Sequence, residues 1–63
     1  MLFQVTNTED KPVLVNAWQV ECVYQYSGFN GRPSTKIQMS KGSYIHTYQS
    51  VEEVQEEVIR ASN

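Results

Sequence analysis

The spacing of the apolar residues changes once along this chain, at Ser50. Before that point, β-branched and aromatic residues recur at every second position, which is the period of a half-buried strand. After it, Val51, Val54 and Val58 follow the helical period of about 3.6 residues. The pattern therefore predicts a series of strands that ends in one C-terminal helix.

Five strands are expected, separated by segments that are rich in turn-forming residues. Their predicted bounds are Leu2–Thr6, Pro12–Val15, Trp18–Tyr26, Thr35–Ser40 and Ser43–Tyr48. The expected fold class is mainly β with one C-terminal α-helix. In it, a small, curved antiparallel sheet of about five strands is capped by the helix, in a single domain over residues 1–63.

The helix has a clear starting signal. Ser50 is a favourable N-cap, and Glu53 three residues later completes a capping box. A helix this short does not hold alone in water, so its valine stripe needs a sheet face to cover. The expected partners of the stripe are the residues on one face of the last two strands, Ile37, Met39 and Ile45.

The chain is small enough for its stability to be marginal. At 63 residues a domain buries only about 60% of its unfolded surface. A single cysteine and a single histidine exclude an intrachain disulfide and the usual zinc sites built from those residues. Regular packing and self-association remain as sources of stability, and we expect a homo-oligomer.

Charge and hydropathy restrict the partners. The formal net charge is −2, and the few Lys and Arg residues are spread thinly, whereas phosphate-tracking grooves cluster them. No stretch approaches the roughly 18 apolar residues of a membrane span, and the N-terminus lacks the pattern of a signal peptide. We expect a cytoplasmic protein that uses neither nucleic acid nor a membrane.

Two residues near the third strand invite a functional interpretation. Cys22 is expected to be a small core residue, since nothing beside it suggests an activated thiol, and a reactive role is the alternative. Trp18 follows the corner at Asn16 and Ala17, where we expect it to close the end of the sheet rather than to stack on a ligand.

Most of the chain resembles a family of small bacterial proteins. The segments "KPVLVNAWQVECV" and "TKIQMSKGSYIHTYQSVEEVQEEVI" are similar to those of the FlbD family, which shares a "VLVNA" type strand and corner, a glycine turn and "ESVEEV" before its helix. Gln49 stands here in place of that glutamate. The resemblance implies a role linked to flagella and swarming motility, or a short phage or prophage relative, and it supplies no catalytic residues.

The fifth predicted strand is unusually aromatic. Tyr44, His46 and Tyr48 share one face, because side chains at alternate positions point the same way. One interpretation is a β-prone, half-buried surface without a partner. The other is a contact surface, since tyrosine is enriched in binding hot spots. In the second case these three residues form an interface, most simply with a second copy of the chain.

The glycine-rich segment between the third and fourth strands suggests a rival function. Phe29 and Arg32 in this loop suit a planar or anionic ligand, through stacking and charge. The alternative hypothesis is therefore a phage-type protein that binds or sequesters a nucleotide-like molecule. Its site would consist of Phe29, Arg32, Lys36, Tyr24 and Tyr26.

Catalysis is the weakest of the hypotheses. His46 has no nucleophile or acid at a spacing typical of a known motif. We therefore predict a small non-enzymatic binding or assembly module, without cofactor or metal. It is expected to self-associate through its exposed aromatic sheet surface or through edge strands.

Overall fold

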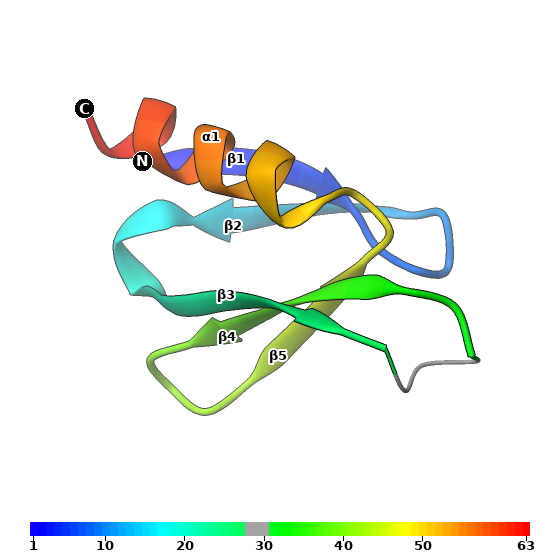
Figure 1. The fold of residues 1–63 in the computed structure, drawn as a ribbon. Coiled ribbons are helices and arrows are strands. Elements are labelled where there is room, and N and C mark those ends of the chain that lie inside the picture. The colour runs from blue at the N-terminus through cyan, green and yellow to red at the C-terminus, as the bar shows by residue number, and fades with distance from the viewer. Residues whose placement is uncertain (28–30) are drawn as a thin grey trace.

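The computed structural model describes residues 1–27 and 31–63. In chain order, the elements are β1 (Leu2–Thr6), β2 (Pro12–Asn16), the 3-10 helix η1 (Ala17–Gln19), β3 (Val20–Tyr26), β4 (Ser34–Met39), β5 (Tyr44–Thr47) and α1 (Val51–Ser62). The prediction of a mainly β fold with one C-terminal helix is confirmed. Figure 1 shows the β1–β2 hairpin and α1 above the other three strands.

The strands form two antiparallel sheets, β1-β2 and β3-β4-β5. The prediction of one sheet of five strands is therefore wrong. In the described part of the chain, backbone pairing between the segments of β1 and β5 is limited to a bridge between Asn7 and Thr47 and to a hydrogen bond of 3.1 Å from Thr8 N to the His46 carbonyl. Beyond it, the Asn7 side chain accepts the backbone N–H groups of Glu9 and Lys11 at 2.9 and 3.0 Å. This local turn bends the chain away from β5 before a longer ladder can form.

The third strand begins later than its apolar pattern suggests. The Asn16 side chain accepts the N–H of Trp18 at 3.0 Å and caps the turn of η1. Trp18 therefore lies in the turn, where it is 74% exposed. The expectation that Trp18 closes the end of the sheet is wrong, because the cap turns Ala17 inward and leaves the indole outside.

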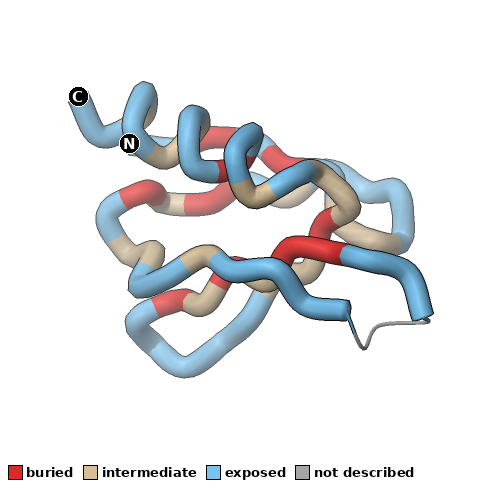
Figure 2. Tube along the Cα trace, viewed as in Figure 1, coloured by how far each residue is buried: buried red, intermediate tan, exposed pale blue. Residues whose placement is uncertain are grey.

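The core lies between the two sheets and the helix. Its buried apolar members are Phe3, Val5, Val15, Ala17, Ile37, Met39 and Val54, and Figure 2 shows these buried segments facing one another. Ile45 and Val58 pack against this cluster, so the helix and the predicted sheet face share one core. The main neighbours of α1, however, are β1, η1 and β3.

The helix begins where the sequence predicts. Glu53 N donates to the Ser50 hydroxyl at 3.1 Å, and Ser50 N donates to the Glu53 carboxylate at 3.3 Å. The capping box is thus complete. Within the described part of the chain, no helix is long and apolar enough to cross a bilayer.

Candidate functional site

The outer face of β3-β4-β5, away from the core, carries most of the aromatic residues singled out by the sequence. Strand register places Tyr24 opposite Lys36, and Lys36 opposite His46. Residues directly opposite each other point to the same side of a sheet. The aromatic face is defined here as Tyr24, Tyr26, Lys36, Tyr44 and His46.

Two rings of this face lie beside one ammonium group. Lys36 Nζ lies 3.9 Å from the ring centroid of Tyr44 and 5.0 Å from that of Tyr26. The rings of Tyr26 and His46 are tilted against each other, with centroids 5.4 Å apart. A cation this close to two rings is held by the ring quadrupoles. The aromatic face is therefore an ordered surface with a half-buried positive centre.

The predicted interface residues are only partly brought together. Tyr44 and His46 belong to the aromatic face, and Tyr44 is 52% exposed. Tyr48 lies beyond the end of β5, where the Arg32 guanidinium carbon is 3.7 Å from its ring centroid. The alternation of the strand stops at Thr47, so Tyr48 does not continue the strand face of Tyr44 and His46.

The predicted ligand residues also divide into two groups. Tyr24, Tyr26 and Lys36 lie on the aromatic face, whereas Arg32 contacts Tyr48 instead. Phe29 lies outside the described residues. The structure thus places three of the five residues of the proposed ligand site on one surface.

Cys22 lies at one end of the aromatic face rather than in the core. It is exposed, and its thiol donates to the Gln38 side-chain oxygen at 3.7 Å. The same Gln38 donates to the Glu21 carboxylate at 2.9 Å. The register shifts between Val20 and Cys22, as in a β-bulge. This extra residue turns Cys22 outward, so the prediction of a core cysteine is wrong.

A second surface escaped the sequence interpretation. Leu2, Leu14 and Trp18 are 63%, 66% and 74% exposed. Ala17 N donates to the Met1 carbonyl at 2.8 Å, which holds the chain terminus beside η1. These four residues, Met1, Leu2, Leu14 and Trp18, are called the hairpin patch below. The signal was present in "LFQV" and "PVLV", which have apolar residues at both alternating positions.

The hairpin patch lies on a strand face that carries no charged side chain. The outward-facing residues of β1 and β2 are Leu2, Gln4, Thr6, Pro12, Leu14 and Asn16. Within residues 1–27 and 31–63, β2 pairs with β1 on one side and with no strand on the other. Its second edge therefore offers backbone groups to a further strand.

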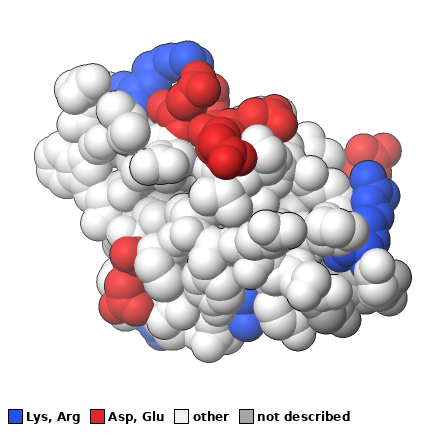
Figure 3. Space-filling model, in the orientation of Figure 1, with Lys and Arg blue, Asp and Glu red and all other residues white. Residues whose placement is uncertain are grey.

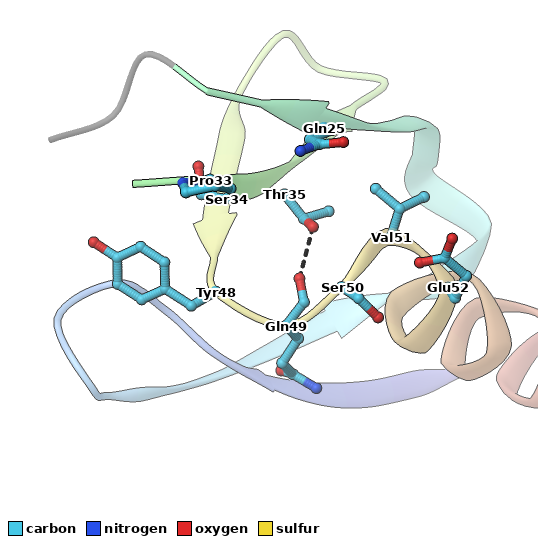
Figure 4. Close-up of a pocket in the computed structure, with 9 residues that line it drawn as sticks. All are labelled: Gln25, Pro33, Ser34, Thr35, Tyr48, Gln49, Ser50, Val51 and Glu52. Atoms are coloured by element: carbon cyan, nitrogen blue, oxygen red, sulfur yellow. Dashed lines mark hydrogen bonds between the residues drawn. The ribbon is translucent and has the colours of Figure 1, made fainter. Parts of the chain in front are cut away.

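A third surface is a groove between β3 and α1, with a volume of about 310 Å³. Its apolar lining comes from Val20, Val23, Val51, Val58 and Ile59. A second hollow adjoins it at Val51 and extends to Gln25 and Glu52 (Figure 4). The two hollows together follow β3 along much of its length.

The described residues contain no group of three His, Cys, Asp or Glu side chains that could hold a metal ion. Comparison of this chain with protein-family models, with curated proteins and with solved structures found no match. The resemblance to the FlbD family therefore stays a prediction.

Proposed function

We propose that this protein is a small, non-enzymatic assembly module that binds a second copy of itself through the β1–β2 hairpin. The observation that carries the proposal is the hairpin patch, whose four large side chains are all more than 60% exposed. Burying an exposed leucine contributes roughly 1.5–3 kcal/mol, and tryptophan is enriched among the residues that dominate binding energy. Association would cover side chains that the small core leaves outside.

Symmetry favours a second copy as the occupant. In a two-fold dimer the same surface is used twice, so a charged side chain near the two-fold axis lies close to the same side chain of the second copy. Like charges directly opposite each other destabilise a strand pair. Pro12–Asn16 contain no charged residue, and antiparallel pairing centred on Leu14 would place Lys11 opposite Ala17 of the second copy. The edge of β2 thus fits a copy of itself without repulsion.

The aromatic face is the second candidate interface. Tyr24, Tyr26 and Tyr44 are 39%, 36% and 52% exposed, and tyrosine suits contacts that are part apolar and part polar. Lys36 at its centre is drawn to the rings of its own chain. A two-fold contact through this face would bring two such cations together unless the copies were offset.

Ligand binding is the alternative function. The observation that favours it is the ammonium of Lys36 beside the rings of Tyr26 and Tyr44, a combination that can stack on a nucleobase and attract a phosphate. A thermal-shift series with nucleoside mono-, di- and triphosphates tests it. A rise in melting temperature that Lys36→Gln abolishes would support this function, and no shift with any of them would reject it.

The chain carries its own probe for self-association, because Trp18 is its one tryptophan. Dimerisation through the hairpin patch would bury the indole, so its emission is expected to shift to shorter wavelength as protein concentration rises. Light scattering on the same samples is expected to show the mass of a dimer. A dimer whose tryptophan emission never shifts would exclude the hairpin patch as the interface.

A charge on the edge strand provides the matched variant. Leu14→Lys places two ammonium groups near the proposed axis and is expected to give a monomer with an unchanged fold, since Leu14 is 66% exposed. Ser43→Lys adds the same charge in the exposed turn before β5 and is expected to leave the dimer intact. If the parent is monomeric at high concentration, the assembly function is wrong.

A further inference from the structure

The groove between β3 and α1 has the geometry of a strand-addition site. Within the described part of the chain, β3 pairs with β4 on one side and with no strand on the other. α1 runs beside this open edge, and the groove lies between them. An extended peptide added to an open sheet edge gains main-chain hydrogen bonds, while pockets beside the edge select alternate side chains.

The floor of the groove would select apolar side chains. Val20 and Val23 of β3 are half-buried and face Val51 and Val58 of α1 across the groove. Ile59, on the flank of the helix, is 54% exposed at its rim. A strand next to β3 would lie about 4.8 Å from it, with every second side chain directed at this lining.

The rim of the groove carries negative charge. Figure 3 shows acidic side chains along α1 and others at the lower left, with an uncharged band between them. Of the four glutamates of α1, Glu53 completes the cap and Glu57 pairs with Arg60 at 2.9 Å. Glu52 lines the adjoining hollow and Glu21 lines the groove itself. Neither forms a salt bridge among the described residues, and Glu21 keeps its charge while its carboxylate accepts a hydrogen bond from Gln38.

We infer that this groove binds an extended segment of another protein, with apolar residues at alternate positions and Lys or Arg at its flanks. Charge distinguishes this occupant from a second copy, because symmetric pairing through β3 would bring Glu21 and the acidic helices of both copies toward each other. The edge of β2 has no such conflict. The open edges of β2 and β3 therefore suit different partners, and this inference does not depend on self-association.

The test uses a labelled probe peptide, Lys-Arg-Val-Thr-Val-Thr-Val-Arg-Lys, and fluorescence anisotropy on the full chain. The first control peptide replaces its four basic residues by glutamate, and the second carries N-methyl groups on alternate backbone nitrogens. The basic peptide is expected to bind at least about tenfold more tightly than either control, a difference of about 1.4 kcal/mol. Equal affinity for the N-methylated peptide would overturn strand addition, and failure of the basic peptide to bind would overturn the site.

Variants of the chain locate the site. Glu52→Lys is expected to lower the affinity for the basic peptide about five- to tenfold and to reduce the salt dependence of binding. Glu9→Lys makes the same charge change in the β1–β2 turn and is expected to change the affinity by less than about twofold. Ile59→Asp is expected to lower the affinity of the protein for both the basic peptide and the N-methylated peptide.

Amide resonances provide the decisive map. The peptide is expected to shift resonances of β3 and of Val51, Gln55 and Ile59, and to slow hydrogen exchange of β3 amides that face the open edge. Shifts confined to the aromatic face or the hairpin patch would overturn the assignment. The oligomeric mass of the protein is measured by light scattering in parallel. Failure of the peptide to bind therefore does not decide whether the protein forms a dimer.

Discussion

The hydroxyl of Thr47 donates a hydrogen bond of 2.6 Å to the backbone carbonyl of Thr6, which lies 41 residues earlier in the chain. Thr47 is fully buried, and its oxygen also accepts the N–H of Gln49 at 3.2 Å. The Gln49 side chain in turn accepts the N–H of Thr6 at 3.1 Å. These three residues connect the two sheets where regular strand pairing ends.

The first prediction concerns this connection. Thr47→Val keeps the shape of the side chain but leaves the partly buried Thr6 carbonyl without its donor. Such a loss costs about 1–3 kcal/mol, and for a domain of this size each kcal/mol lowers the melting temperature by roughly 4–8 °C. Thermal unfolding followed by circular dichroism measures the effect. Thr8→Val, at the half-buried turn, is the matched control and is expected to melt within about 2 °C of the parent.

Local signals in the sequence predict the elements well. The capping box at Ser50 and Glu53 and the valine stripe are set by residues a few positions apart, and both are confirmed. The division into two sheets depends on Asn7 and Thr47, which lie forty positions apart in the chain. The alternation of residues within each strand therefore does not reveal where the two sheets separate.

The candidate surfaces were harder to predict for a related reason. Cys22 points outward because one extra residue, Glu21, shifts the register of β3, and a hydrophobic pattern does not reveal on which side of a bulge a cysteine lies. The hairpin patch could not be predicted from the pattern, because alternation does not show which apolar residues a small core leaves exposed. A 63-residue chain has too little interior for all of them.

The second prediction tests how the helix is docked. Val54 is fully buried, and Val54→Asp places a carboxylate in the core without a partner. We expect the variant to be unfolded at 25 °C, because the free-energy cost of burying an unpaired charge exceeds the free energy of unfolding of a domain of this size. Gln55→Asp makes the same change of charge one residue along the helix on an exposed position, and it is expected to remain folded. Far-ultraviolet circular dichroism of both distinguishes these outcomes, and a native spectrum for Val54→Asp would contradict the helix packing.

The third prediction concerns the helix cap. Ser50→Ala removes the acceptor of the Glu53 N–H, and we expect a loss of about 0.5–2 kcal/mol in the free energy of unfolding. Ser50→Asp keeps an acceptor at the same position and is expected to restore most of this loss. Urea unfolding measures both variants. Equal stability of Ser50→Ala and the parent would mean that the cap does not contribute.

The fourth prediction separates the aromatic face from the hairpin patch as the dimer interface. Tyr44→Ala removes the ring that lies 3.9 Å from Lys36 Nζ, and Tyr48→Ala removes the ring that contacts Arg32. If the hairpin patch forms the interface, both variants keep the dimer mass of the parent in light scattering, and so does His46→Gln. A monomer produced by Tyr44→Ala but not by Leu14→Lys would transfer the interface to the aromatic face.

The fifth prediction uses the exposed thiol. Cys22 is accessible at one end of the aromatic face, so a maleimide is expected to label the native protein without denaturant. The matched control is the double variant Cys22→Ser and Val15→Cys, whose thiol would occupy a position that is 1% exposed in the parent and would react only after unfolding.

A bulky label on Cys22 then covers part of the aromatic face and leaves the hairpin patch free. The labelled protein is expected to dimerise as the parent does, with the same blue shift of Trp18. Loss of the dimer on labelling would instead show that the copies meet through the three-stranded sheet, and slow labelling of the native chain would contradict the outward orientation of Cys22.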